Sequence, residues 1–341
     1  MLNFSIHTFE LRLETKTSEI CKIRDWLYSD NIPIRKYGNG ILNILTYANE
    51  GVRIRFVPDN YIPYFSFIVN LREVLDNGNL VDLIDPLDVD LALEQVNHMI
   101  EAFLGEGYDI NTLKLCRIDC CVNVDTGSQE AVNAYLKMFN YKSGGKGYNI
   151  KNINSPKGYC QNEFRAENRN GDIALSIYNK MAQLISIKRK SEAARAEGIM
   201  RVEVQLKRHS AITKLISREL SNSDIIRETV LNSHNIITDV LFSVLYPGSY
   251  LKLKDAIKFV NLNVKKQKLR QRMIRLLELT AMKHSTTLAR DVIFSEDKKL
   301  SKNYYQKMII EFHKLNLNVV TLGRRSRFGY LKGLDELFYN K

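Results

Sequence analysis

The stretch CRIDCCVNVD, residues 116–125, decides the fold that this sequence predicts. Written as an extended strand, it alternates apolar and polar side chains, because successive residues of a strand point to opposite faces of a sheet. One face receives Ile118, Cys120, Val122 and Val124, and the other receives Arg117, Asp119, Cys121, Asn123 and Asp125. The stretch therefore predicts a sheet with one packed face and one face that carries ionisable groups.

Two later segments repeat this alternation. GDIALSIYNK, residues 171–180, places Ser176, Tyr178 and Lys180 opposite Ile173, Leu175 and Ile177. GIMRVEVQLKR, residues 198–208, places Arg201, Glu203, Gln205 and Lys207 opposite Met200, Val202, Val204 and Leu206. We expect the three strands to be neighbours, which would gather two carboxylates, one phenol and several cations in one patch.

This patch has the composition of a phosphoryl-transfer site. Asp119 and Glu203 are predicted to hold Mg²⁺ or Mn²⁺ through oxygen, which leaves positions for water and a phosphate. Tyr178 is the predicted nucleophile, and Lys180 on the same face is predicted to assist, because a phenol with a pKa of about 10 needs a nearby cation at neutral pH. An alternative stays open, since any half-solvated antiparallel sheet has a charged outer face.

The patterns on either side of these segments predict an α+β protein. Further strands are expected at 3–14, 40–46, 52–57 and 64–70, with helices near 88–104 and 128–139 that cover one face of the sheet. Beyond residue 209, apolar residues at helical spacing run through 223–246, 251–260, 264–281 and 298–315. The sequence therefore predicts a sheet-based nuclease domain over 1–208, followed by a smaller, mostly helical domain over 209–341 that contacts DNA or a partner protein.

The distribution of charge points to a polyanionic partner. The formal net charge is +12, but residues 1–130 hold 11 basic and 20 acidic residues, whereas the remainder holds 39 basic and 18 acidic residues. Such asymmetry is typical of a chain that binds nucleic acid mainly through one part, although a basic solvated surface is the alternative. The predicted DNA contacts are Arg117, Arg201, Lys207, Arg270, Arg324, Arg325 and Arg327, the last three in the segment GRRSRFGY.

Other classes of protein are disfavoured by what the sequence lacks. No run of about 18 apolar residues occurs and the first residues do not have the layout of a secretion signal, so we expect a cytoplasmic protein without a membrane partner. Five cysteines without paired CxxC spacing are expected to be reduced and structural. Six scattered histidines form no HxH or HExxH motif, so each is expected to be structural.

The three strands, in this order, resemble the gene II replication proteins of filamentous phages and the plasmid and phage relatives of the gene II/X family. The similarity rests on Arg117, Ile118 and Asp119, then on Tyr178 and Lys180, then on Arg201 and Glu203. It falls within about 110–210; the segment 314–337 is similar more loosely, and the first hundred residues match poorly. Paired histidines that hold the metal in many rolling-circle nucleases have no counterpart here, so the two carboxylates would carry more of the coordination.

The resemblance implies a relaxase-like antiparallel sheet and a rolling-circle replication initiator. Tyr178, by position, would cut one strand of a single-stranded or melted origin, form a 5′-phosphotyrosine link with the help of Mg²⁺ or Mn²⁺, and later reseal the displaced strand. A host helicase is an expected partner. Two other functions stay open, a DNA-binding regulator without catalysis and a two-metal nuclease that uses water. Rival tyrosines are Tyr304 and Tyr305, and more weakly Tyr141, Tyr148 and Tyr159.

Overall fold

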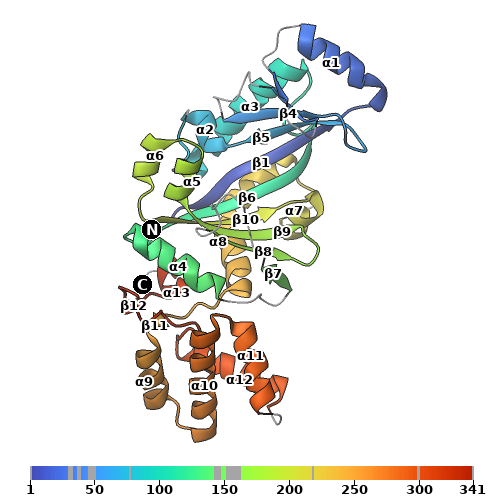
Figure 1. The fold of residues 1–341 in the computed structure, drawn as a ribbon. Coiled ribbons are helices and arrows are strands. Elements are labelled where there is room, and N and C mark those ends of the chain that lie inside the picture. The colour runs from blue at the N-terminus through green and yellow to red at the C-terminus, as the bar shows by residue number, and fades with distance from the viewer. Residues whose placement is uncertain are drawn as a thin grey trace.

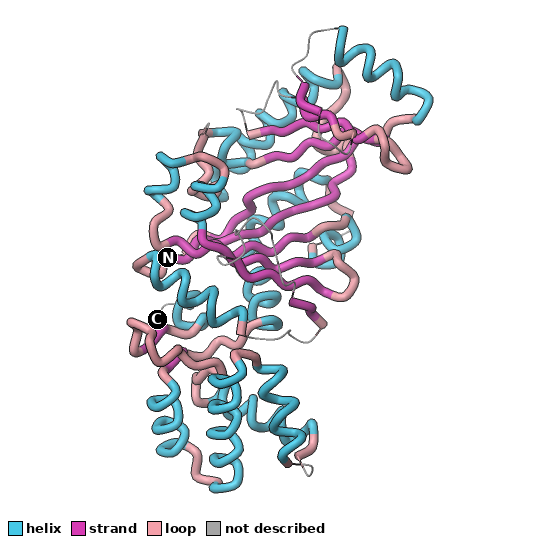
Figure 2. Tube along the Cα trace, in the orientation of Figure 1, coloured by secondary structure: helices cyan, strands magenta, loops and turns pink. Residues whose placement is uncertain are grey.

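A ten-stranded antiparallel sheet forms the centre of the molecule. The computed structural model describes residues 2–29, 34–36, 40–44, 51–76, 78–141, 147–150, 163–216, 219–297 and 300–339. The strand order is β2-β3-β4-β5-β1-β6-β10-β9-β8-β7, and Figure 2 shows the strands of the sheet in magenta. The strands are β1 (Phe4–Glu14), β2 (Ile34–Lys36), β3 (Leu42–Ile44), β4 (Val52–Val57), β5 (Tyr64–Val69), β6 (Lys114–Asp125), β7 (Tyr148–Ile150), β8 (Glu163–Asn168), β9 (Ile173–Asn179) and β10 (Ile199–Leu206).

Helices surround this sheet and form a second group beyond it (Figure 1). Those that accompany the sheet are α1 (Ile20–Ser29), α2 (Leu71–Leu75), α3 (Val89–Leu104), α4 (Gln129–Asn140), α5 (Lys180–Ser186), α6 (Lys190–Arg195), α7 (His209–Leu215), α8 (Asn222–Val244) and α13 (Leu334–Tyr339). The second group is α9 (Leu253–Asn263), α10 (Gln267–Lys283), α11 (Thr286–Glu296) and α12 (Lys302–Lys314). The short strands β11 (Tyr250–Leu251) and β12 (Tyr330–Leu331) pair with each other. The predicted α+β architecture is confirmed.

The long helix α8 covers the apolar face of the central strands. It contacts β1, β6 and β10, and its buried residues Ile226, Val230, Ile237 and Leu241 recur at the spacing of one helix face. The side chain of Ser221 accepts a hydrogen bond from the Asp224 backbone N–H and so begins the helix. This packing belongs to one continuous hydrophobic core that contains the inward residues of the sheet.

A second hydrophobic core lies among α9 to α12. Its buried residues run from Ala256 to Val319, whereas α7, α8 and the closing stretch from Val320 to Phe338 belong to the core of the sheet. Helices α7 and α8, which follow the boundary predicted at residue 208, therefore pack on the sheet, and the buried residues of the second core begin at Ala256. That the two parts act as a nuclease domain and a DNA-binding domain stays a prediction.

Candidate active site on the open face of the sheet

The fold places the three polar strand faces side by side, as the alternation predicts. Strand β10 pairs with β6 on one side and with β9 on the other. In the register of these pairs Glu203 lies opposite Cys121 and Ser176, and Arg201 lies opposite Tyr178. The expectation that the three strands are neighbours is confirmed, and their ionisable residues share one face of the sheet.

Tyr178 and Glu203 meet in a cavity of about 380 Å³ on this face. The phenol O–H of Tyr178 donates a hydrogen bond of 3.2 Å to Oε2 of Glu203. Burial, and then the nearby Glu203 carboxylate, raise the pKa of the phenol well above its ordinary value. The phenol is therefore neutral at neutral pH, and Glu203 is placed to accept its proton when the oxygen reacts.

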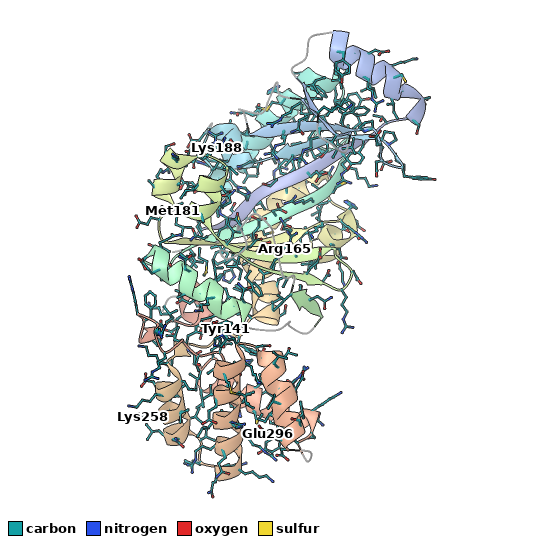
Figure 3. The ribbon with its side chains drawn as sticks, in the orientation of Figure 1. Tyr141, Arg165, Met181, Lys188, Lys258 and Glu296 are labelled. Atoms are coloured by element: carbon teal, nitrogen blue, oxygen red, sulfur yellow. The ribbon has the colours of Figure 1, made fainter. Side chains whose placement is uncertain are left out.

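Strand β8, which the sequence pattern missed, provides another wall of this cavity. Its residue Glu163 lies opposite Tyr178 and Arg165 lies opposite Ser176, and both side chains line the cavity. Figure 3 labels Arg165 on the sheet, Met181 on the adjacent helix α5 and Lys188 in the turn that follows α5. The signal was present in EFRAEN, since inward Phe164 and Ala166 alternate with charged residues.

Asp119 is buried beside Arg117 at the edge of the same patch. The two guanidinium contacts to its carboxylate are a 2.7 Å hydrogen bond from Nε to Oδ1 and a shorter one from Nη2 to Oδ2. Burial, and then the charge of Glu203, raise the pKa of Asp119 to about 7, against the opposing effect of Arg117. The Glu203 carboxylate is thus close enough to disfavour the ionisation of Asp119, which a bound cation would relieve.

The donor set near Asp119 fits a hard divalent cation only in part. The described residues contain no cluster of three or more histidine, cysteine, aspartate or glutamate side chains. Magnesium sites in enzymes often use one or two carboxylates and take their other ligands from water and substrate phosphate. Asp119 and Glu203 would supply the two carboxylates of such a site, and water and a substrate phosphate would have to supply the other ligands.

Lys180 is almost fully buried at the start of α5. Asn179 begins this helix by accepting a hydrogen bond from the Ala182 backbone N–H, which places Lys180 in the first turn. The Lys180 ammonium donates a 3.0 Å hydrogen bond to Oε1 of Gln183. Burial, and then the charge of Arg201, lower the pKa of Lys180 to about 7.

Replacing Lys180 measures how much folding free energy the burial of this lysine costs. We expect Lys180→Met to raise the free energy of unfolding at pH 6, with a gain that shrinks as the pH rises toward 10. Between pH 7 and the ordinary pKa of 10.5 the unfolded chain binds more protons than the folded chain, so wild-type stability rises with pH and the variant lacks this rise. The change amounts to roughly 4 kcal/mol. Urea unfolding of both proteins at pH 6 and pH 10 measures it, and a pH-independent difference would contradict the burial of a neutralised lysine.

Arg201 does not lie on the surface of the patch. Its side chain is fully buried, with Nε donating a 2.8 Å hydrogen bond to Oδ1 of Asn123 and Nη2 donating to the Val81 carbonyl. The direct DNA contact predicted for Arg201 is therefore wrong, because the segment around Val81 covers this end of the face. Alternation identifies the side of the sheet, but not which part of that side a loop covers.

The other predicted DNA contacts fall in separate places. Arg117 is one-third exposed beside Asp119, and Lys207 Nζ lies 2.5 Å from Oε1 of Glu167. Arg270 is half-buried on α10 in the second core region. The exposed Arg324, Arg325 and Arg327 lie in a loop that forms a cavity of about 330 Å³ with α4. Their contact with DNA stays a prediction.

The C-terminal arginine loop nevertheless lies near the end of β9. Helix α4, which borders the loop, contributes Asn133, whose Oδ1 accepts a 3.2 Å hydrogen bond from Nδ2 of Asn179. Asn179 follows Tyr178 directly. The arginine loop and the Tyr178 cavity are therefore connected through α4 and the end of β9.

The rival tyrosines occupy structural positions. Tyr305 is buried in the second core, and the guanidinium of Arg272 lies 4.4 Å above the ring of Tyr304. Tyr141 stacks on His284, with ring centroids 4.7 Å apart. Tyr148 is half-buried on β7, and Tyr159 lies outside the described residues, as do Cys160 and most of the glycine-rich loop. Tyr178 is the tyrosine that the fold brings beside Glu203.

Comparison with known proteins gives one kind of match. No family model and no curated protein matches this chain. Among solved structures, a similar chain is the rolling circle replication initiator protein from Geobacillus stearothermophilus, with 14% sequence identity and a TM-score of 0.36. The similarity covers 72% of this chain and 86% of that chain. At this identity and TM-score it carries no inference about chemistry, which rests on the residues described above.

Proposed function

We propose that this protein is a rolling-circle replication initiator that nicks one DNA strand at an origin with Tyr178. The observation that carries the proposal is the phenol of Tyr178 in an open cavity, 3.2 Å from the carboxylate of Glu203 on β10, with Asp119 and Arg117 on β6 at the other side of β10. The resemblance of these same strands to gene II/X replication proteins supports the assignment of the substrate as DNA.

The chemistry is a transesterification. The phenol oxygen of Tyr178 forms a bond to phosphorus while its proton passes to Glu203, and the bond from phosphorus to the 3′ oxygen breaks. That oxygen leaves with the electron pair and is protonated to a 3′-hydroxyl, which can prime synthesis. The reverse attack by a 3′-hydroxyl on the phosphotyrosine reseals the strand and frees the phenol.

A cation would assist at the carboxylates. Mg²⁺ or Mn²⁺ held by Asp119 and Glu203 would polarise the scissile phosphate when bound. Arg117 keeps the Asp119 carboxylate oriented through two hydrogen bonds. The second core region, with the arginine loop 323–330, would bind flanking DNA or a host helicase.

The test is the formation of a covalent adduct. We expect the protein to attach labelled single-stranded DNA from the origin of its own replicon when Mn²⁺ is present, and to stop doing so in excess EDTA. Glu203→Gln should raise the Mn²⁺ concentration for half-maximal attachment by at least about tenfold and also lower the rate at saturating Mn²⁺, because one carboxylate that serves as cation ligand and proton acceptor is lost. The matched control is Glu14→Gln, an exposed glutamate paired with Lys114 on the far part of the sheet.

The outcomes on a denaturing gel separate the three candidate functions. Attachment of label to protein supports the initiator. Metal-dependent cleavage without attachment would instead indicate a nuclease that uses water. Binding without cleavage on an active origin would indicate a regulator, and both of these results would overturn the proposal.

A further inference from the structure

A second cavity, of about 400 Å³, lies beside the Tyr178 cavity. Its walls come from β1, β4, β5, α2 and α5, elements that lie next to one another along this side of the sheet (Figure 1). Gln183 lines both cavities, and Lys180, which lines the second, donates its hydrogen bond to Gln183. The two cavities are therefore neighbours across a single pair of side chains.

The charged groups around the second cavity favour an anion. Two arginines line it, Arg53 and Arg189, together with Lys180, whose pKa is lowered to about 7, against one carboxylate, Glu73. Arg53 is exposed on β4 and makes no hydrogen bond or ion pair with any described residue. The guanidinium of Arg189 lies 3.5 Å from the carboxylate of Glu192, a residue that does not line the cavity. An excess of basic over acidic side chains, with Arg53 free of hydrogen bonds to described residues, is a composition that suits a phosphate.

His7 adds a buried donor to this cavity. It lies where β1 shifts its register against β6, between Ile6 and Thr8, a bulge that breaks the alternation of the strand. Nδ1 lies 2.8 Å from Oγ1 of Thr8, while Nε2 is buried and has no hydrogen-bond partner among the described residues. When the Thr8 hydroxyl donates to Nδ1, the neutral ring carries its hydrogen on Nε2 and can donate it to an anion.

The surroundings of His7 argue against a metal ligand. The charged groups that act on the ring are Arg201, Lys180 and Arg117, all of them cations, and burial together with these charges lowers the pKa of His7 well below its ordinary value. A divalent cation would be repelled by the same three groups. An anion would be attracted by them and would satisfy the free Nε2 hydrogen.

We propose that this cavity binds a phosphodiester of the DNA strand next to the scissile bond, with Arg53 and His7 as donors. The strand then crosses from the Tyr178 cavity to the second cavity beside Gln183. This assignment rests on the proposed function and adds the direction in which the strand leaves the nucleophile, across β1 toward β4. It also places a DNA contact in the N-terminal part of the chain, whose net charge is negative.

The test removes one phosphate charge at a time. Fluorescence anisotropy would measure the affinity for single-stranded oligonucleotides derived from the origin, each with one neutral methylphosphonate linkage at a different position. All proteins would carry the Tyr178→Phe substitution, so that no cleavage occurs. We expect one position near the nick to weaken binding roughly tenfold, the effect of one lost charged hydrogen bond. Arg53→Ala should weaken unmodified DNA by a similar factor and abolish sensitivity at that position.

The control is Arg24→Ala on α1, an exposed arginine whose contact is a 3.5 Å ion pair with Asp59. It should keep the full methylphosphonate profile of the parent protein. If Arg53→Ala also keeps that profile, the second cavity does not bind a phosphodiester. Adduct formation by the protein that retains Tyr178, measured in parallel, separates the two proposals. If the adduct forms but Arg53→Ala keeps its sensitivity to the methylphosphonate, the second cavity alone is rejected. If Arg53→Ala loses that sensitivity but no adduct forms, the nicking mechanism alone is rejected.

Discussion

Tyr178→Phe is expected to abolish covalent attachment of the cleaved strand while leaving DNA binding nearly unchanged. The substitution removes the attacking oxygen and its hydrogen bond to Glu203, but keeps the ring that fills the site. Loss of a catalytic nucleophile lowers the rate by at least about three orders of magnitude. The measurement is the initial rate of protein-linked label on a denaturing gel, with Mn²⁺ and origin DNA, alongside anisotropy for binding.

Tyr304→Phe is the matched control for this experiment. Tyr304 lies on α12 beneath the guanidinium of Arg272, in the second core region and away from the polar strand faces. It should form the adduct at the rate of the unmodified protein. Adduct formation by Tyr178→Phe at an undiminished rate would show that another tyrosine attacks, and the role proposed for Glu203 would fall with it.

The neighbouring strands of the site could be predicted because one physical rule governs all three. Where a sheet buries one face, apolar residues must recur with period two, and β9, β10 and the part of β6 from Arg117 onward follow this rule. The same rule misses β2 and β7, which have three residues each and so too few positions to show a period. Their pairing is fixed by their neighbours in the sheet and not by their own sequence.

The sequence patterns could not predict which residues of the open face are covered by other segments of the chain. Alternation correctly gives Arg201, Glu203 and Tyr178 a common side, but Arg201 is buried because the segment at Val81, 120 residues away in sequence, accepts its hydrogen bond. His7 was also beyond the pattern, since the bulge at Thr8 changes which face the residue meets. Contacts of this kind depend on tertiary packing, which a single strand's sequence does not record.

Replacing Arg201 is expected to cost about 3 kcal/mol of folding free energy, because buried acceptors lose their donors, and this is the second large effect that the structure predicts. In Arg201→Met the apolar chain keeps much of the volume, but Oδ1 of Asn123 loses its donor and the Val81 carbonyl keeps only the 2.8 Å hydrogen bond from Nδ2 of Asn123. Relief of the repulsion between Arg201 and Lys180 offsets part of this loss. Urea unfolding at pH 7 gives the free energies of both proteins.

Arg195→Ala supplies the comparison that isolates burial as the cause. Arg195 holds the next residue of the same segment, since its Nη2 lies 2.8 Å from Oδ2 of Asp82, but both side chains are about half exposed. An exposed ion pair contributes less than about 1 kcal/mol, because water solvates the separated charges. Two arginines that anchor adjacent residues should therefore differ severalfold in their effect on stability. Equal losses would mean that the position of the segment, rather than the buried guanidinium, determines the stability of this part of the sheet.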